Sequence, residues 1–419
     1  MLADVSVIGL GRVGLPLALS FADRGLRVMG IDNDPVRLDP VRAGRMPFQE
    51  TGTDDLLARL HPTGLLALSD RVEDAAAADH IVITLGTPSF SHIEIDMSGI
   101  RSVVDTLIPH LRPGHSLTLR STIAPGTTEF VAGYIAKHRD FTIGDDVFVA
   151  HCPERIAAGH FLEEISTLPC IVGGVGERSG ERVASLFEVF GARIVQTTPV
   201  QAELAKIWTN IIRYTQFALP NLLMMDCDQY GANVFEVIDL INRDYPRGGI
   251  ARPGFTAGTC LRKDFTFSEE RSSAPGMLLA VSRVNETVPH FLVEGVKRRL
   301  GTLSGRKVAV LGLAFKADTD DERDSLAHKL VRLLERELAD VAIHDPHVAT
   351  PTQGLDEAVA GAEVVFVATN HSVFCSPRTL DRIAVSASPE CVVVDPWDCF
   401  GASQVFAYAS ELAIMSGTL

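Results

Sequence analysis

The chain has 419 residues, enough for two or three domains, and 46% of them are hydrophobic, so it can bury a sizeable core. Its formal net charge of −15 disfavours nucleic acid or an anionic membrane as a partner, and it lacks the long apolar run of a membrane span. Its cysteines are scattered without a C-x-x-C pair, so neither a zinc site nor a disulfide framework is indicated, and we expect a cytoplasmic protein without a metal.

Residues 3–32 carry the pattern of a dinucleotide-binding turn. An apolar run, which no basic leader or cleavage site precedes, ends in the spacing Gly9-x-Gly11-x-x-Gly14. A helical stretch and a second apolar run follow, and the latter ends at Asp32. This acid would accept a hydrogen bond from a ribose 2′-hydroxyl and repel a 2′-phosphate, which favours NAD over NADP. The alternative is a turn whose glycines serve packing only.

Strand-like and helical stretches alternate after this unit, and the alternation predicts a doubly wound parallel sheet. The strand-like runs are 80–85, 116–119 and 147–150, and the helical stretches are about 97–111 and 127–138. Polar residues follow these strands: Thr87 and Pro88, Ser121 and Thr122, and Glu154 and Arg155. Ligands of such sheets bind outside the carboxyl ends of the strands, so we expect these loops to converge on one crevice, although each alone is typical of an ordinary turn.

The central part of the chain is poor in glycine and predicts long helices. Apolar residues recur at helical spacing from about 199, which indicates one long helix ending near Tyr230, and a second helical stretch covers about 276–300. Three polar side chains fall on one face of the first helix: Glu203, Lys206 and Asn210. A solvated face is the alternative to a functional one. Long helices between two α/β lobes commonly pair, so we expect a homodimer.

The segment 252–264, RPGFTAGTCLRKD, places Cys260 after glycines and shortly before the cations Arg262 and Lys263. Glycine allows a ligand to approach the backbone closely, and a neighbouring cation favours the reactive thiolate of a cysteine. This pattern indicates a nucleophile. The competing interpretation is a small buried hydrophobic residue, which is what most cysteines are.

A second, smaller α/β domain follows. Its strand-like runs are 307–311, 340–344, 363–368 and 391–394. The sequence GLAFK after the first run resembles the start of a Rossmann unit without its glycine fingerprint, so we expect it to bind a nucleotide other than the redox cofactor. The predicted fold is α/β, with an N-terminal Rossmann domain (1–198), a central long-helix region (199–302) and a smaller C-terminal Rossmann-like domain (303–419).

With these residues assembled, the chain resembles the UDP-glucose/GDP-mannose dehydrogenase family over nearly its whole length. The matching motifs, in the order and spacing of the family, are GLGRVGLPLA, RSTIAPGTTE, CPERIAAGH, AELAKIWTN, RPGFTAGTCLRKD, LGLAFKADTDDERDS and ATNHSVF. The resemblance implies an NAD-dependent four-electron oxidation of C6 of a nucleotide sugar to a carboxylate. It implies a UDP-sugar as substrate and a cysteine-bound thiohemiacetal and thioester as intermediates.

The resemblance also implies catalytic roles for individual residues. Cys260 matches the nucleophile, and Lys206 and Asn210 match the pair that holds the developing oxyanion. Asp264 matches the carboxylate that orients a water molecule or Lys206 for proton transfer. Glu154 matches the glutamate that assists thioester hydrolysis, whereas Thr122 matches a threonine near the reacting centre.

Further residues match the binding positions of the family. The implied cofactor-binding residues are Gly9, Gly11, Arg12, Val13, Gly14, Asp32, Thr87, Pro88, Ser121, Thr122, Lys263 and Arg323. The implied substrate-binding residues are Glu154, Arg155, Lys206, Asn210, Arg252, Phe255, Gly258, Phe315 and Lys316, of which Phe315 and Lys316 match the segment that meets the pyrophosphate.

Departures from the family pattern leave the sugar open. Ala257 replaces a glycine and Arg262 a proline at the sugar end of the implied pocket. Thr259 resembles the serine of the UDP-glucose branch, while the N-terminal domain is more similar to the branch that oxidises UDP-N-acetylhexosamines such as UDP-ManNAc or UDP-GlcNAc. Two other functions stay open: a two-electron hydroxy-acid or sugar-acid dehydrogenase, and a non-catalytic nucleotide-sugar-binding protein.

Overall fold

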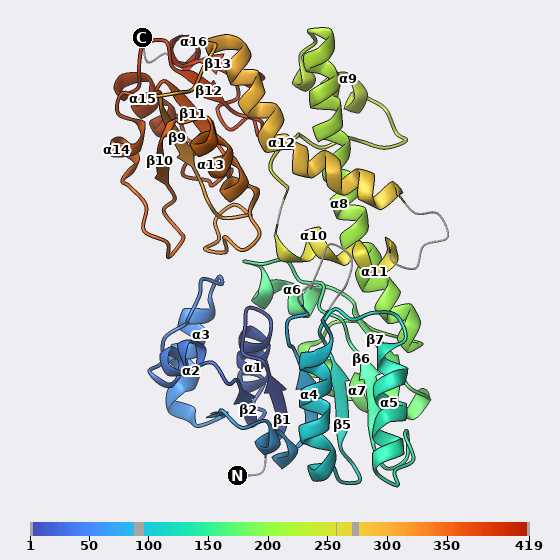
Figure 1. Ribbon diagram of the computed structural model, residues 1–419. Helices are drawn as coiled ribbons and strands as arrows, with labels where there is room; N and C mark the ends of the chain where they lie inside the picture. The colour runs from blue at the N-terminus through green and yellow to red at the C-terminus, as the bar shows by residue number, and fades with distance from the viewer. Residues whose placement is uncertain (1–2, 88–95, 257, 270–275, 417–419) are drawn as a thin grey trace. The chain divides into compact units, whose positions relative to one another are not determined.

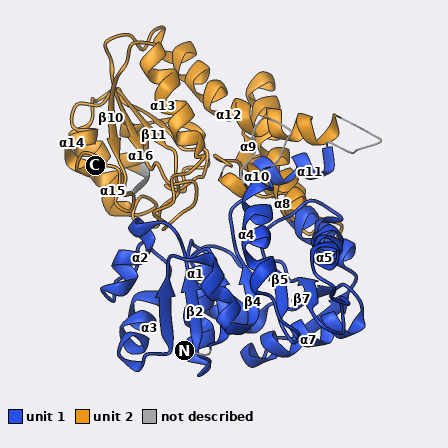
Figure 2. Ribbon diagram, turned by 60° about the horizontal axis from the view of Figure 1, so that its bottom comes forward, with its two compact units in different colours: residues 1–209, 263–271 blue, residues 210–262, 272–419 orange. Residues whose placement is uncertain are grey.

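The computed structural model describes residues 3–87, 96–256, 258–269 and 276–416. The chain forms two compact units: residues 1–209 with 263–271, and residues 210–262 with 272–419 (Figure 2). The first boundary lies inside a long helix, and the chain returns to the first unit for only a short segment. The three-domain division expected from the sequence stays a prediction.

The first unit is built on a sheet of eight described strands in the order β3-β2-β1-β4-β5-β6-β7-β8. Neighbouring strands are parallel, as predicted, except for the antiparallel pair β6 and β7. The strands are β1 (Ala3–Ile8), β2 (Val28–Ile31), β3 (Leu66–Ser69), β4 (Ala78–Ile83), β5 (Ser116–Leu119), β6 (Phe148–His151), β7 (Cys170–Gly174) and β8 (Ile194–Thr197).

Helices cover both faces of this sheet, because successive strand residues point to opposite sides. On β4, Val82 joins one hydrophobic cluster, whereas Ile81 and Ile83 join the other. Figure 1 shows α4 and α5 in front of the sheet. The helices are α1 (Gly14–Asp23), α2 (Pro35–Arg42), α3 (Thr53–Leu60), α4 (Ser98–Leu107), α5 (Thr127–His138), α6 (Phe161–Thr167) and α7 (Glu177–Phe187), with short 3-10 turns η1 (His61–Thr63), η2 (Val72–Ala77), η3 (Ile108–His110) and η4 (Glu188–Phe190).

The second unit holds a sheet of five described strands in the order β10-β9-β11-β12-β13, of which β12 and β13 pair antiparallel and the others parallel. The strands are β9 (Lys307–Leu311), β10 (Asp340–His344), β11 (Val364–Val367), β12 (Val392–Val394) and β13 (Phe406–Tyr408). The helices of this part are α12 (Met277–Leu300), α13 (Leu326–Arg336), α14 (Leu355–Val359), α15 (Pro377–Ser386) and α16 (Ala409–Ser416). The edge strand β13 was not predicted.

The long central helix is present as α8 (Pro199–Tyr230), which has 32 residues and ends where the sequence indicated. It is followed by α9 (Val234–Asn242), whose first turn is capped by the side chain of Asn233. The cysteine segment is not only a glycine-rich turn: Cys260 lies in a short helix, α10 (Thr259–Asp264), and α11 (Thr266–Glu269) comes next.

A disulfide joins Cys375 and Cys399 in the second unit, a pair that the sequence had not indicated. The two cysteines follow β11 and β12, which are adjacent parallel strands. Their loops therefore meet at one edge of the sheet, a proximity that the spacing of the cysteines in the sequence did not show. Among the described residues, no helix is long and apolar enough to cross a membrane.

Candidate functional site

The three glycines after β1 are required for different physical reasons. Gly9 adopts φ +94°, which favours glycine, and a Cβ atom on Gly14 would lie 1.8 Å from the Gly9 carbonyl oxygen. At Gly11, by contrast, the nearest atom to an added Cβ is Arg37 Nη1, 3.9 Å away. Packing therefore explains Gly9 and Gly14 but leaves an open cradle at Gly11, as a closely approaching phosphate would require.

The end of β2 supplies the acid expected for the ribose. Asp32 is 5% exposed, and its Oδ2 accepts hydrogen bonds from Leu10 N at 2.7 Å and from Arg37 Nη1 at 3.1 Å. At the start of α1, the N-cap residue Val13 gives the helix no side-chain cap. The N–H groups of the first turn can therefore receive an anion. The open cradle, the helix start and Asp32 together fit a dinucleotide, and no sequence motif had singled out Arg37.

Four of the residues expected in the site form a hydrogen-bonded chain in the first unit. Lys263 Nζ lies 2.8 Å from Asp264 Oδ1 and 3.2 Å from Thr87 Oγ1, and the Thr87 hydroxyl donates to the Thr122 carbonyl oxygen at 2.8 Å. Asp264 is 0% exposed and Lys263 9%. A buried ammonium needs such partners, so this arrangement fixes Lys263 beside the loops after β4 and β5.

Glu154, after β6, is held by four donors. Its Oε2 accepts from Nε of Arg120 at 3.1 Å and also pairs with Nη2 of that guanidinium, while Oε1 accepts from the backbone N–H groups of Arg155 and Ile156 at 2.7 and 2.8 Å. These four hydrogen bonds fix the position of the carboxyl group at the end of β6. Arg120 is buried. Burial is the largest single influence and would lower its pKa, but the charges of Glu154, Cys152 and Cys170 and the hydrogen bond to Glu154 together raise it. Arg120 opens the motif RSTIAPGTTE, but the sequence had assigned it no role; a cation at the end of the buried strand β5 was the available signal.

The polar face of α8 divides into a structural and a candidate functional part. Glu203 accepts hydrogen bonds from Gly126 N at 2.7 Å and Thr128 N at 2.9 Å, so it anchors the start of α5. Lys206 and Asn210 lie one turn apart on the same face, with Lys206 part-buried and Asn210 6% exposed. Burial lowers the pKa of the nearby His151 to about 3, and the charges of Arg120 and Lys206 act in the same direction.

The glycines before Cys260 are required by rings of the second unit. A Cβ atom on Gly254 would lie 2.4 Å from the Trp397 ring, and one on Gly258 would lie 2.7 Å from the Phe315 ring. Gly258 also has φ +97°. The segment is therefore packed against the loops that follow β9 and β12, and Phe315, an implied substrate residue, lies against it.

Two further arginines brace this segment. Arg252 forms an ion pair with Asp398. Arg262 Nε donates to Glu286 Oε1 at 2.6 Å and Nη1 donates to the Asp324 carbonyl oxygen at 3.0 Å, so its guanidinium ties α10 to α12 and to the loop before α13. In the structure, the guanidinium of Arg262 therefore connects neighbouring elements. The sequence analysis had instead expected Arg262 at the sugar end of the implied pocket.

Cys260 itself is exposed, whereas the other cysteines outside the disulfide are buried or part-buried. Arg323 makes a two-pronged pair with Asp321, at 2.8 and 2.7 Å. This pair is the main reason why the pKa of Arg323 is raised, and the charge of Cys260 adds to it. The guanidinium thus lies within electrostatic reach of the sulfur, a setting that favours a thiolate.

The other expected site residues are placed as follows. Arg12 lies over the Phe48 ring at 5.1 Å, Ser121 is 6% exposed, and Arg155 bonds the Pro169 carbonyl oxygen. Phe255 is 5% exposed and belongs to the hydrophobic core of the second unit, and Lys316 is part-buried. Pro88 and Ala257 lie outside the described residues.

A histidine-rich group in the second unit has the composition of a metal site but not its chemistry. Single ligand atoms of Asp318, His347 and His371 lie within 4.8 Å of one another. However, the backbone N–H of Asp318 donates to His371 Nδ1 at 2.8 Å, so the lone pair that a metal would use is taken. Nε2 of His371 then donates to Asp345; burial opposes ionisation there, but this bond and backbone donors lower the pKa of Asp345.

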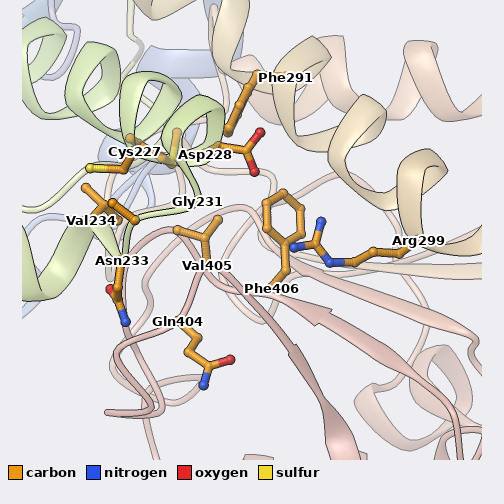
Figure 3. A pocket seen from close by; sticks show the side chains of 12 residues that line it. Cys227, Asp228, Gly231, Asn233, Val234, Phe291, Arg299, Gln404, Val405 and Phe406 are labelled. Atoms are coloured by element: carbon orange, nitrogen blue, oxygen red, sulfur yellow. The ribbon is translucent and has the colours of Figure 1, made fainter.

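A cavity of about 250 Å³ lies between the end of α8, the start of α9, α12 and β13. The guanidinium of Arg299 stacks on the Phe406 ring at 4.1 Å at one wall, and Cys227, Val234 and Phe291 form other walls (Figure 3). None of its described lining residues is among those that the sequence placed in the site, so the cavity does not enter the assignment of function.

Comparison with known proteins covers almost the whole chain. Residues 3–191 match the NAD binding domain, 200–287 the central domain and 309–402 the UDP binding domain of the UDP-glucose/GDP-mannose dehydrogenase family. The chain is 33% identical over 379 residues to UDP-N-acetyl-D-mannosamine dehydrogenase of Pyrococcus horikoshii, covering 89% of this chain and 90% of that one. It is 31% identical over 422 residues to NDP-N-acetyl-D-galactosaminuronic acid dehydrogenase of Ralstonia nicotianae, covering 96% and 97%.

Solved structures agree. The UDP-D-ManNAc dehydrogenase from Pyrococcus horikoshii superposes with a TM-score of 0.85 at 32% identity, covering 92% of this chain and 93% of the other. A UDP-glucose dehydrogenase from Pyrobaculum islandicum superposes with a TM-score of 0.81 at 30% identity, covering 90% and 92%.

Proposed function

The chain belongs to the UDP-glucose/GDP-mannose dehydrogenase family, with NAD as its cofactor, and from that premise we propose that it oxidises C6 of a UDP-sugar to the carboxylate. The observation that carries the proposal is the exposure of Cys260 on α10, the short helix that also contains the paired Lys263 and Asp264. A nucleophilic cysteine has to be accessible, whereas a packing cysteine does not.

The proposed roles follow the chemistry of a primary alcohol. A bound NAD would supply the acceptor for one hydride, so the oxidation consumes two NAD molecules in turn. Between these events the Cys260 thiolate adds to the aldehyde carbon, so the reactive aldehyde stays on the enzyme as a thiohemiacetal and then becomes a thioester. Lys206 and Asn210, one turn apart on α8, are proposed to hold the oxyanion.

We assign proton transfer and thioester hydrolysis to two carboxyl side chains. We assign Asp264 to orient a water molecule or Lys206. We assign Glu154, which is held in position by four hydrogen-bond donors, to assist hydrolysis of the thioester. We also assign Thr122 to the surroundings of the reacting centre; its carbonyl oxygen accepts a hydrogen bond from Thr87. A residue fixed this firmly is held ready for the transition state, which supports these roles.

Binding is divided between the two nucleotides. The cradle at Gly11, the start of α1 and Asp32 are proposed to bind the cofactor, together with Arg12, Ser121, Lys263 and Arg323. For the UDP-sugar we propose Phe315 and Lys316, with Arg155, Arg252, Phe255 and Gly258 as supporting residues; the packing of Gly258 on the Phe315 ring supports this grouping.

We propose a UDP-N-acetylhexosamine as the preferred sugar, because the two relatives compared above carry names of N-acetylhexosamine-type substrates. UDP-glucose is the second candidate, supported by Thr259 and by the similarity to the Pyrobaculum islandicum enzyme. A cytoplasmic location and a homodimer complete the proposal.

The test is a substrate panel of UDP-ManNAc, UDP-GlcNAc, UDP-glucose and GDP-mannose, each with NAD and NADH absorbance as readout. We expect NADH formation with at least one UDP-N-acetylhexosamine and a Cys260→Ser variant that binds the same UDP-sugar but forms no uronate. Binding of a UDP-sugar without NADH formation by the unaltered protein would instead indicate a non-catalytic binding protein.

A further inference from the structure

Two cysteine sulfurs lie in contact beside Glu154. Cys152 follows β6 and Cys170 begins β7, and these two strands are the antiparallel neighbours of the first sheet. The Sγ atoms are 3.4 Å apart, and Cys152 is 0% exposed whereas Cys170 is part-buried. None of the roles assigned above uses either thiol.

Arg120 connects this thiol pair to the carboxylate. Its Nη1 donates to Cys152 Sγ at 3.3 Å and to the Cys152 carbonyl oxygen at 3.2 Å, while its Nε donates to Glu154 at 3.1 Å. The guanidinium also lies over the Phe187 ring at 5.0 Å. One buried cation therefore holds both the sulfur and the carboxylate, so a change at the sulfur reaches Glu154 through a single side chain.

A small cavity opens onto Cys170. It has a volume of about 30 Å³, and Arg120, Glu154 and Phe187 also line it. This is room for one or two molecules the size of water, because one such molecule occupies about 10–15 Å³ on this measure. Hydrogen peroxide, with two oxygen atoms, fits that room, whereas a glutathione disulfide does not.

The two thiols are chemically unequal. The hydrogen bond from Cys152 lowers the pKa of the Cys170 thiol, and the charge of Arg120 acts in the same direction against burial. Burial raises the pKa of Cys152. Cys170, which faces the cavity, is thus the better nucleophile, and Cys152 is placed to react with it second.

We propose that Cys152 and Cys170 form a peroxide-reactive dithiol, whose oxidation to a disulfide lowers the dehydrogenase activity by shifting Arg120 and with it Glu154. The disulfide stands independently of the proposed function, whereas the effect on activity rests on it.

The chemistry balances with a hydroperoxide as oxidant. The Cys170 thiolate attacks one peroxide oxygen, the O–O bond breaks, and the leaving hydroxide takes up a proton to give water. The sulfenic acid at Cys170 is then attacked by the sulfur of Cys152, and the S–O bond breaks with release of a second water molecule. The two thiols lose two electrons and two protons, and the peroxide is reduced to two molecules of water.

Disulfide formation has to move atoms around Arg120. The two sulfurs approach from 3.4 Å to a bond of about 2.05 Å, and Cys152 no longer offers the same acceptor to the guanidinium. A misplacement of about 1 Å at a catalytic group can cost about a hundred-fold in rate, so we expect a loss of roughly that order or somewhat less.

The first experiment maps the bond. The full-length protein is treated with hydrogen peroxide, alkylated, digested without reduction and analysed by mass spectrometry, with Cys170→Ser, Cys170→Ala and the control Cys227→Ser treated alike. We expect a linked pair of peptides containing Cys152 and Cys170 in the unaltered protein and in Cys227→Ser. Its absence from both, while other thiols are oxidised, would overturn the proposal.

The second experiment measures UDP-sugar oxidation before and after peroxide, and again after dithiothreitol. Because Cys260 also reacts with peroxide, its alkylation is followed in the same samples. We expect a dithiothreitol-reversible loss in the unaltered enzyme that exceeds the loss in Cys170→Ser at equal modification of Cys260. Equal losses in both would overturn the effect on activity. A linked peptide in a protein that is inactive on every UDP-sugar even when reduced would support the dithiol and reject the proposed function.

Discussion

At the scale of single residues, the cofactor preference depends on how one carboxylate is paired. Asp32 accepts from Leu10 and from Arg37, so the acid that would meet the ribose also restrains the nearest cation. Arg37 is 44% exposed at its side chain and bonds Asp34 as well, at 3.5 Å. In dinucleotide-binding turns, an arginine at such a position can bind the 2′-phosphate of NADP. The pairing of Arg37 with Asp32 therefore disfavours NADP.

We predict that Asp32→Ser raises the ratio of kcat/KM for NADP over NAD. The variant removes the repulsion of the 2′-phosphate and releases Arg37 to bind it, and one charge-assisted hydrogen bond corresponds to about ten- to a hundred-fold. The matched control is Asp39→Ser, which removes an exposed acid paired to Arg42 on the same helix. An unchanged ratio in Asp32→Ser, or an equal gain when Arg37→Ala is added, would reject this role of Arg37.

Local pattern alone could predict the residues whose reason is local, but not the pairing of Arg120 with Glu154. Gly9 and Gly14 are required by the turn itself, and Asp32 follows its strand directly, so a short motif contained them. Arg120 and Glu154 are 34 residues apart, and only the sheet brings the ends of β5 and β6 together. A buried ion pair of this kind leaves no periodic signal in the sequence.

At the scale of elements, the long helices were predictable and the short ones were not. In α8 apolar residues recur at helical spacing over many turns, which outweighs the interior Pro220. The six residues of α10 follow a run with glycines at Gly254 and Gly258, so their local pattern indicated a turn. The conformation of this segment depends on its packing against the rings of Trp397 and Phe315, which come much later in the chain.

The exposed side of α8 carries an apolar stripe. Its members are Leu204, Trp208, Ile212, Leu219 and Leu222, each between 39% and 55% exposed. Their spacing puts them on one face of the helix. A continuous apolar face on a long helix favours pairing with a second copy of the chain, and it supports the proposed homodimer.

We predict that Trp208→Glu combined with Leu219→Glu weakens self-association by about a hundred-fold or more, because a central tryptophan dominates such interfaces and a charge there is desolvated. Light scattering after size-exclusion chromatography at several concentrations measures it. Arg213→Glu is the control, since this exposed residue lies on another face of α8. A doubly substituted protein that keeps the mass of the unaltered one would show that the stripe is not the interface.

At the scale of the whole molecule, alternation of strands and helices predicted the two α/β sheets and the helical region between them. It could not predict that the boundary between the compact units falls inside α10, between Arg262 and Lys263. That boundary gives Lys263 and Asp264 to the first unit, where Lys263 bonds both Asp264 and Thr87, and leaves Cys260 in the second. Long-range contacts also produced the Cys375–Cys399 disulfide and the Cys152–Cys170 pair, which no spacing rule foretold.

The central claim is a four-electron oxidation in which Cys260 retains the aldehyde. The most direct measurement is the number of NADH molecules formed for each UDP-sugar consumed, followed by absorbance and by chromatography of the sugar nucleotide in the same reaction. We predict two NADH for each sugar, with the uronate as product and no free aldehyde trapped by a hydrazine reagent. One NADH for each sugar, with aldehyde released into solution, would contradict the claim.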